Sequence, residues 1–180
     1  MSEAHRNGNP APGASNAFGN PPATRRASAG VLTAMQTPDI ARTAKVHWEG
    51  DIARGKGQID AESGTVSANY SFNTRFSNEP GTNPEELLAA SHAACFTMAL
   101  TLGLSRAGHP PASVDTSARV HLRRVGEGFD ITLIELSTAV TAAGLDDAEF
   151  QKIAAGAKEN CPISKALRTV EIHLDAKLNS

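Results

Sequence analysis

Cysteine and aromatic residues are scarce in this chain of 180 residues, which has two cysteines, one tryptophan and one tyrosine. Two cysteines are too few for the disulfide framework of a small secreted protein, and they form no CxxC pair. None of the six histidines belongs to an HExxH motif, so we expect no metal site and no cofactor. A net charge of −2 and isolated aromatic residues give no reason to expect nucleic acid as a partner.

Long hydrophobic runs are also missing from the sequence. No continuous apolar segment reaches the ~20 residues that cross a bilayer, so we expect no membrane partner. The N-terminus has no basic stretch followed by a long apolar core, which argues against a secretion signal. We therefore expect a cytoplasmic, reducing compartment, where two cysteines are more often free or catalytic than joined in a structural disulfide.

The N-terminal residues 1–38 are rich in Pro, Gly, Ala, Asn and Ser and show little hydrophobic periodicity. Such a segment buries too little apolar surface to offset the entropy lost on ordering it. We therefore predict a disordered extension over 1–38 and one folded domain over 39–180.

The strongest local signal is the segment GTNPEELLAASHAACFTMALTLGLSRAG, which begins at Gly81. Asn83 is a favoured helix N-cap, Pro84 suits the first helical position, and Gly108 is a typical helix stop. The apolar residues between these signals occupy nearly every side of the helix, which is typical of a buried helix that a partner often covers. The pattern predicts a central helix of about 24 residues.

Alternating patterns on both sides of this helix predict strands, and two further helices follow near the C-terminus. The predicted strands lie at 45–51, 58–61, 67–76, 116–125, 128–140 and 169–178, and the two helices at 144–160 and 161–167. This order of elements predicts an α+β fold in which antiparallel sheet wraps around helices.

Cys161 is the more suggestive thiol on local chemistry. Pro162 follows it and fits a first helical turn better than a helix interior, so Cys161 becomes the N-cap of a new helix. Free backbone N–H groups at that position stabilise a thiolate, and Lys165 lies one turn further on. The alternative is a small buried residue at a junction between helices.

Cys95 lies in the middle of the long helix, among alanines and leucines. Burial raises the pKa of a thiol, so a reactive Cys95 requires a cation beside it, and an inert core cysteine does not. Arg75, Arg106 and His92 are the candidate cations in this part of the sequence. His92 lies one turn before Cys95, where it either pairs with the thiol or simply packs in the core.

Three segments together resemble one known family. VHWEGDIARGKG, NTRFSNEPGTNPEELLAASHAACFTMAL and ENCPISKAL are similar to segments of the OsmC/Ohr family of organic hydroperoxide reductases, on the OsmC branch. The resemblance covers 44–180. It implies an intertwined homodimer in which antiparallel sheets wrap around a long central buried helix.

The same resemblance implies roles for four residues. Cys95 would be the peroxidatic cysteine, which becomes a sulfenic acid, and Cys161 would resolve it as a Cys95–Cys161 disulfide. Arg75 would polarise the peroxide and the thiolate, and Glu85 would pair with Arg75. An external dithiol, in the family dihydrolipoamide or a lipoylated protein, would recycle the disulfide. The alternative on the same fold is a non-catalytic redox sensor or a protein that binds hydrophobic ligands.

One expectation about these residues follows from helix geometry alone. Ten residues separate Glu85 from Cys95, which is roughly 15 Å along an α-helix. If both lie on one unbroken helix, Glu85 cannot reach the Cys95 of its own chain. We therefore expect Glu85, and Arg75 with it, to serve the Cys95 of a partner subunit.

Overall fold

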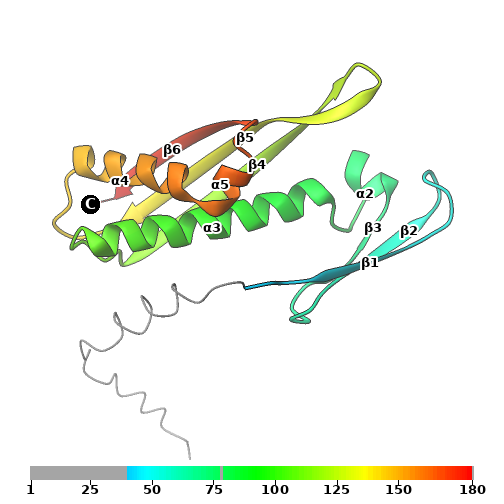
Figure 1. Ribbon diagram of the computed structural model, residues 1–180, viewed down its shortest axis with the longest axis horizontal. Helices are drawn as coiled ribbons and strands as arrows, with labels where there is room; N and C mark the ends of the chain where they lie inside the picture. The colour runs from blue at the N-terminus through cyan, green and yellow to red at the C-terminus, as the bar shows by residue number, and fades with distance from the viewer. Residues whose placement is uncertain (1–39, 78, 180) are drawn as a thin grey trace, which may run out of the picture. The chain divides into compact units, whose positions relative to one another are not determined.

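The computed structural model describes residues 40–77 and 79–179 (Figure 1). The chain divides into two units, residues 1–42 and residues 43–180. The predicted disordered extension over 1–38 lies outside the described residues. Every helix and strand of the described part belongs to the second unit.

The first sheet is formed by three short strands, β1 (Ala44–Glu49), β2 (Lys56–Ala61) and β3 (Ser67–Tyr70). They pair antiparallel in the order β1-β2-β3. Gly57 in β2 lies opposite Tyr70, and a Cβ atom at Gly57 would lie 2.0 Å from the Tyr70 ring. Glycine is therefore required at this position for Tyr70 to pack across the strands.

The strand predicted over 67–76 is wrong in its second half. It ends at Tyr70, and the short helix α2 (Phe72–Phe76) follows. Ser71 and Thr74 form a capping box, in which the Ser71 side chain accepts from the Thr74 N–H and Thr74 Oγ1 accepts from the Ser71 N–H. These two bonds satisfy backbone donors that a strand would have paired with a neighbouring strand. The helix carries Arg75.

The long helix α3 (Pro84–Arg106) confirms the prediction of a central helix. The Asn83 side chain accepts a hydrogen bond from the Glu86 N–H, and Pro84 begins the helix. Gly108, two residues after the helix ends, has a φ of 91°, which glycine adopts without strain. The capping signals in the sequence therefore fix both ends of α3.

The second sheet contains β4 (Ser113–Val125), β5 (Gly128–Thr141) and β6 (Glu171–Asn179) in the order β4-β5-β6. β4 and β5 form an antiparallel hairpin, as expected, but β6 pairs parallel to β5. The sheet is therefore mixed. Two helices, α4 (Asp147–Asn160) and α5 (Pro162–Ala166), connect β5 to β6, and such a crossover returns the chain in the same direction.

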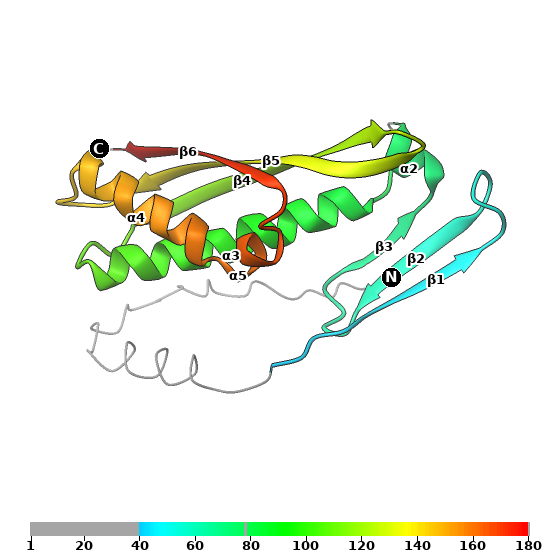
Figure 2. The ribbon, with the colours of Figure 1, turned by 45° about the horizontal axis from the view of Figure 1, so that its top comes forward.

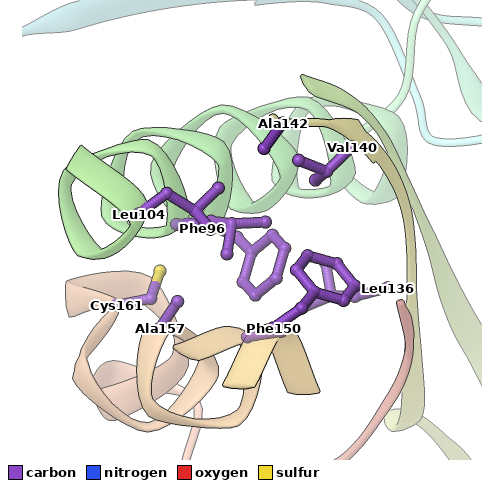
Figure 3. Close-up of a cluster of buried hydrophobic side chains, with 10 residues drawn as sticks. Phe96, Leu104, Leu136, Val140, Ala142, Phe150, Ala157 and Cys161 are labelled. Carbon is purple, nitrogen blue, oxygen red and sulfur yellow. The ribbon is translucent and has the colours of Figure 1, made fainter. Parts of the chain in front are cut away.

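The helices α3 and α4 lie side by side on one face of this second sheet (Figure 2). The core forms between them and the sheet, and Figure 3 shows Phe96 of α3, Phe150 of α4 and Leu136 of β5 at its centre. All three side chains are buried. Cys161 belongs to the same buried cluster.

One chain buries only one stripe of α3. The buried side chains recur every four residues, at His92, Phe96, Leu100 and Leu104. The opposite side stays open to solvent, where 75% of Met98 is exposed. Among the residues that the structure describes, α3 is the one helix long and apolar enough to cross a bilayer by length and composition. The core helix of a soluble protein meets the same test, and the buried stripe of α3 packs as a core helix does.

Candidate active site

The two cysteines, 66 positions apart in the sequence, meet where α3 and α5 pack together. The sulfur atoms of Cys95 and Cys161 are 3.0 Å apart, and both thiols are free. Cys161 is fully buried and Cys95 is partly exposed. Figure 3 shows the Cys161 side chain at the edge of the core cluster, beside α3. A shift of about 1 Å would bring the two sulfur atoms to bonding distance.

Cys161 lies at the junction of two helices. It is the N-cap of α5, as predicted, but it also follows the last residue of α4. The positive end of one helix dipole and the negative end of another therefore meet at this residue. The α5 helix has only five residues, so its dipole at Cys161 is small, and the end of α4 opposes it.

Within a single chain, the surroundings of Cys95 favour the neutral thiol. Burial raises the pKa of Cys95, and the neighbouring Cys161 thiol raises it further. The backbone N–H of Ile163, the second residue of α5, donates to the Cys95 sulfur and acts in the opposite direction. A cation from outside these contacts is therefore needed to make Cys95 a good nucleophile at neutral pH.

His92 does not supply that cation. Its side chain is fully buried, and its Nε2 forms a hydrogen bond of 2.8 Å with Ser164 Oγ in α5. Burial lowers the pKa of His92, and Nδ1 has no hydrogen-bond partner among the described residues. A charged imidazole would leave a second N–H without an acceptor, so the ring is held neutral. The structure thus places His92 in the core.

Arg75 and Glu85 form a bidentate ion pair. Arg75 Nη2 donates to Glu85 Oε1 at 2.6 Å, and Arg75 Nε donates to Oε2 at 3.1 Å. The hydrogen bonds to Glu85 raise the pKa of Arg75, so the guanidinium stays positively charged. The side chains are only 35% and 13% exposed, respectively, so solvent screens this pair less than an open surface pair.

The ion pair lies at the start of α3, whereas the thiol pair lies at its middle. Because α3 runs unbroken from Pro84 to Arg106, Glu85 and Cys95 are about 15 Å apart along its axis. Arg75 and Glu85 line a cavity of about 680 Å³ whose wall includes Phe129 but not Cys95. Within one chain, the Arg75–Glu85 pair and the two thiols are therefore separate. Arg106, the third candidate cation, is the last residue of α3, further still from Cys95 than Glu85.

An aromatic cluster lies beside the ion pair. Phe76 contacts Phe72 and Phe129, with ring centroids 4.7 and 5.1 Å apart, and the Arg75 guanidinium lies 5.4 Å from the Phe76 ring centroid. All three rings are partly exposed, at 41–51%. An exposed aromatic cluster beside a fixed positive charge suits a ligand with a polar head and an apolar body.

Two contacts of the site were missed from the sequence, namely those of Ser164 and Ile163. Ser164 lies three residues after Cys161, just as His92 lies three residues before Cys95. That spacing puts each residue one turn from its cysteine on a helix. This spacing predicts a contact between His92 and Ser164 only when the two cysteines are known to face each other.

Comparison with known proteins places the chain in a family. The family model described as OsmC-like protein matches residues 76–175. The chain belongs to the OsmC-like protein family. It is 51% identical over 142 residues to the peroxiredoxin OsmC of Escherichia coli strain K12, a match that covers 78% of this chain and 99% of the relative.

Solved structures of OsmC and Ohr proteins share the fold. The organic hydroperoxide resistance protein OhrB of Bacillus subtilis is 30% identical, with a TM-score of 0.56 over 76% of this chain and 98% of that one. An organic hydroperoxide resistance protein OsmC from Legionella pneumophila is 26% identical, with a TM-score of 0.61 over 77% and 97% of the two chains. The α+β fold built around a long helix is therefore that of this family.

Proposed function

We propose that this chain is a two-cysteine thiol peroxidase that reduces organic hydroperoxides to alcohols. The observation that carries the proposal is the 3.0 Å distance between the sulfur atoms of Cys95 and Cys161. Two free thiols at this distance suit a disulfide that forms and opens during turnover. The relatives named peroxiredoxin OsmC and organic hydroperoxide resistance protein support a peroxide as the substrate.

The proposed cycle begins at Cys95, the more exposed of the two sulfur atoms. Its thiolate attacks the hydroperoxide O–O bond, the alcohol leaves with a proton, and Cys95 becomes a sulfenic acid. The Cys161 sulfur then attacks the Cys95 sulfur. The thiol proton and the sulfenic hydroxyl leave as water, and a disulfide joins the two residues. A dithiol reduces that disulfide by exchange and becomes a disulfide itself.

The cation that activates Cys95 comes, in this proposal, from a second copy of the chain. Arg75 of α2 is held by Glu85, which lies about 15 Å along α3 from the Cys95 of the same chain, too far for the pair to serve that thiol. A partner subunit packed on the exposed side of α3 would cover Met98 and bring its own Arg75 to the thiol. The positive charge would then stabilise both the thiolate and the developing charge on the peroxide oxygen.

The aromatic cluster of Phe72, Phe76 and Phe129 supports alkyl hydroperoxides over hydrogen peroxide. An alkyl chain gains from burying apolar surface on these rings, and hydrogen peroxide does not. A cytoplasmic location suits the cycle, because a reducing compartment returns the disulfide to thiols. Dihydrolipoamide, or a lipoylated protein, is the dithiol we propose.

The test is steady-state reduction of cumene hydroperoxide with dihydrolipoamide, with hydrogen peroxide as the comparison substrate. The wild-type protein should turn over the alkyl hydroperoxide faster. Cys95→Ser should be inactive, whereas Cys161→Ser should consume one equivalent and then stop. Equal turnover by the Cys95→Ser protein would refute the proposal.

The alternative function is a redox sensor, or a binding protein for hydrophobic ligands, on the same fold. The exposed aromatic cluster beside Arg75 is the observation that favours ligand binding. The same assay separates the two functions. A wild-type protein that binds or is oxidised by one equivalent of hydroperoxide, yet shows no turnover with any dithiol, would be a sensor or a binding protein.

A further inference from the structure

Two parallel contacts tie α5 to α3. Cys161, the N-cap of α5, meets Cys95 of α3, and one helical turn away Ser164 of α5 meets His92 of α3. The two residues on each helix are three positions apart, so the contacts follow each other along the same line of packing. Both involve a fully buried side chain, Cys161 in one and His92 in the other.

The α5 helix is short, although Ile163 packs against the core cluster. It has five residues, Pro162 at its start has no N–H, and Cys161 makes no side-chain hydrogen bond that caps it. Its backbone bonds, such as Lys165 N–H to Cys161 O and Leu167 N–H to Ile163 O, stay within the helix and its caps, apart from the Ile163 N–H that donates to the Cys95 sulfur. Within the described part of the chain, the two contacts are the only hydrogen bonds between two side chains that join α5 and its N-cap to α3.

Only one of the two contacts is independent of the redox state of the thiols. Once Cys95 is a sulfenic acid, the hydrogen bond between the two thiols is lost. The hydrogen bond between His92 Nε2 and Ser164 Oγ involves neither sulfur, and both side chains are buried. This hydrogen bond therefore persists between the oxidation of Cys95 and the formation of the disulfide with Cys161.

We propose that His92 and Ser164 are positioning residues for the resolving step, holding α5 against α3 so that Cys161 reaches the Cys95 sulfenic acid quickly. This inference rests on the proposed peroxidase function. The same hydrogen bond holds the neighbouring Ile163 N–H on the Cys95 sulfur. Loss of the bond leaves α5 free to move away, so resolution slows, and a second hydroperoxide oxidises Cys95 to the sulfinic acid.

The test is a single-turnover experiment on the reduced protein with cumene hydroperoxide. It records the rate of disulfide formation, and mass spectrometry records the sulfinic acid at Cys95 under excess hydroperoxide. Ser164→Ala should slow disulfide formation about tenfold, because it leaves a buried imidazole nitrogen without a partner. The sulfinic fraction should rise in parallel.

Conservative and matched variants separate positioning from simple loss of stability. His92→Gln keeps an amide close to the position of Nε2 and should resolve near the wild-type rate, whereas His92→Leu should resemble Ser164→Ala. Ser105→Ala makes the same chemical change within α3, where the Ser105 hydroxyl donates to Thr101 O. Phe150→Leu lowers stability in the core near the start of α4 but leaves the hydrogen bond between His92 and Ser164 intact. Both controls should form the disulfide at the wild-type rate.

A second readout is the pH dependence of Cys95 alkylation by iodoacetamide in the Cys161→Ser background. Adding Ser164→Ala should move the midpoint to higher pH, because the Ile163 N–H no longer stabilises the thiolate. The inference is overturned if Ser164→Ala and His92→Leu resolve as fast as wild type, or if Phe150→Leu slows resolution equally. A wild-type protein that forms no Cys95–Cys161 disulfide with hydroperoxide would instead refute the proposed function itself.

Discussion

Mixing two inactive variants should restore hydroperoxide reduction if the ion pair of one chain serves the thiol of another. The first variant, Cys95→Ser, keeps the Arg75–Glu85 pair but lacks the nucleophile. The second, Arg75→Gln, keeps both thiols but lacks the cation. Removing a preorganised charged donor of this kind should lower the rate by about 10²–10³. Each variant alone is therefore close to inactive.

The expected recovery follows from the geometry of α3. Glu85 and Cys95 lie about 15 Å apart on one unbroken helix, so the pair cannot reach the thiol of its own chain. In a mixed dimer, one site joins the intact Cys95 of one chain to the intact Arg75 of the other. Random pairing gives half mixed dimers with one working site each, or about a quarter of wild-type activity.

The assay is steady-state cumene hydroperoxide reduction after the two variants are unfolded and refolded together. The control is the same mixture combined without refolding, which contains no mixed dimers unless subunits exchange. If the refolded mixture stays as inactive as its components while light scattering shows that it is dimeric, the shared site is wrong. A monomeric wild-type protein with full activity would refute it as well.

Three further predictions concern stability, and each can be measured by urea denaturation. Because burial lowers the pKa of His92 below its ordinary 6.5, the unfolded chain binds a proton that the folded chain does not. The stability that His92 contributes is therefore complete above about pH 6.5 and declines as the pH falls toward the folded-state pKa, and His92→Gln should abolish this component. Asn83→Ala should lower the free energy of unfolding by about 1 kcal/mol, since Glu86 N–H loses its cap. Phe150→Ala should cost about 3–5 kcal/mol, because the ring is fully buried in the core; a loss below 1 kcal/mol would contradict the packing in Figure 3.

The parts of the fold that depend on local signals were predictable. Asn83, Pro84 and Gly108 defined α3, because capping and helix termination act within a few residues. The short helix α2 was mistaken for strand, since five residues carry too little periodicity, and Ser71 with Thr74 decides the outcome through two hydrogen bonds. The parallel pairing of β6 with β5 depends on how α4 and α5 cross the sheet, which no local pattern records.

The candidate site shows the same limit. Local chemistry singled out Cys161 and left Cys95 open as an inert core residue, and only the family resemblance joined the two. The structure brings them to 3.0 Å and shows that His92 packs against Ser164 rather than pairing with the thiol. These contacts join residues 66 and 72 positions apart, so they are a product of the packing of α5 on α3. The roles of Cys95, Cys161, Arg75 and Glu85 in turnover stay predictions.

The central claim, that Cys95 is oxidised first and Cys161 resolves it, is tested most directly by mass spectrometry of the single-cysteine variants. Reduced Cys161→Ser and reduced Cys95→Ser are each exposed to one equivalent of cumene hydroperoxide, and a sulfenic acid reagent traps the product. The proposed cycle predicts that Cys161→Ser carries one reagent adduct, at Cys95, and that Cys95→Ser carries none. A sulfenic acid at Cys161 in the Cys95→Ser protein, with Cys95 unreacted in the other variant, would contradict it.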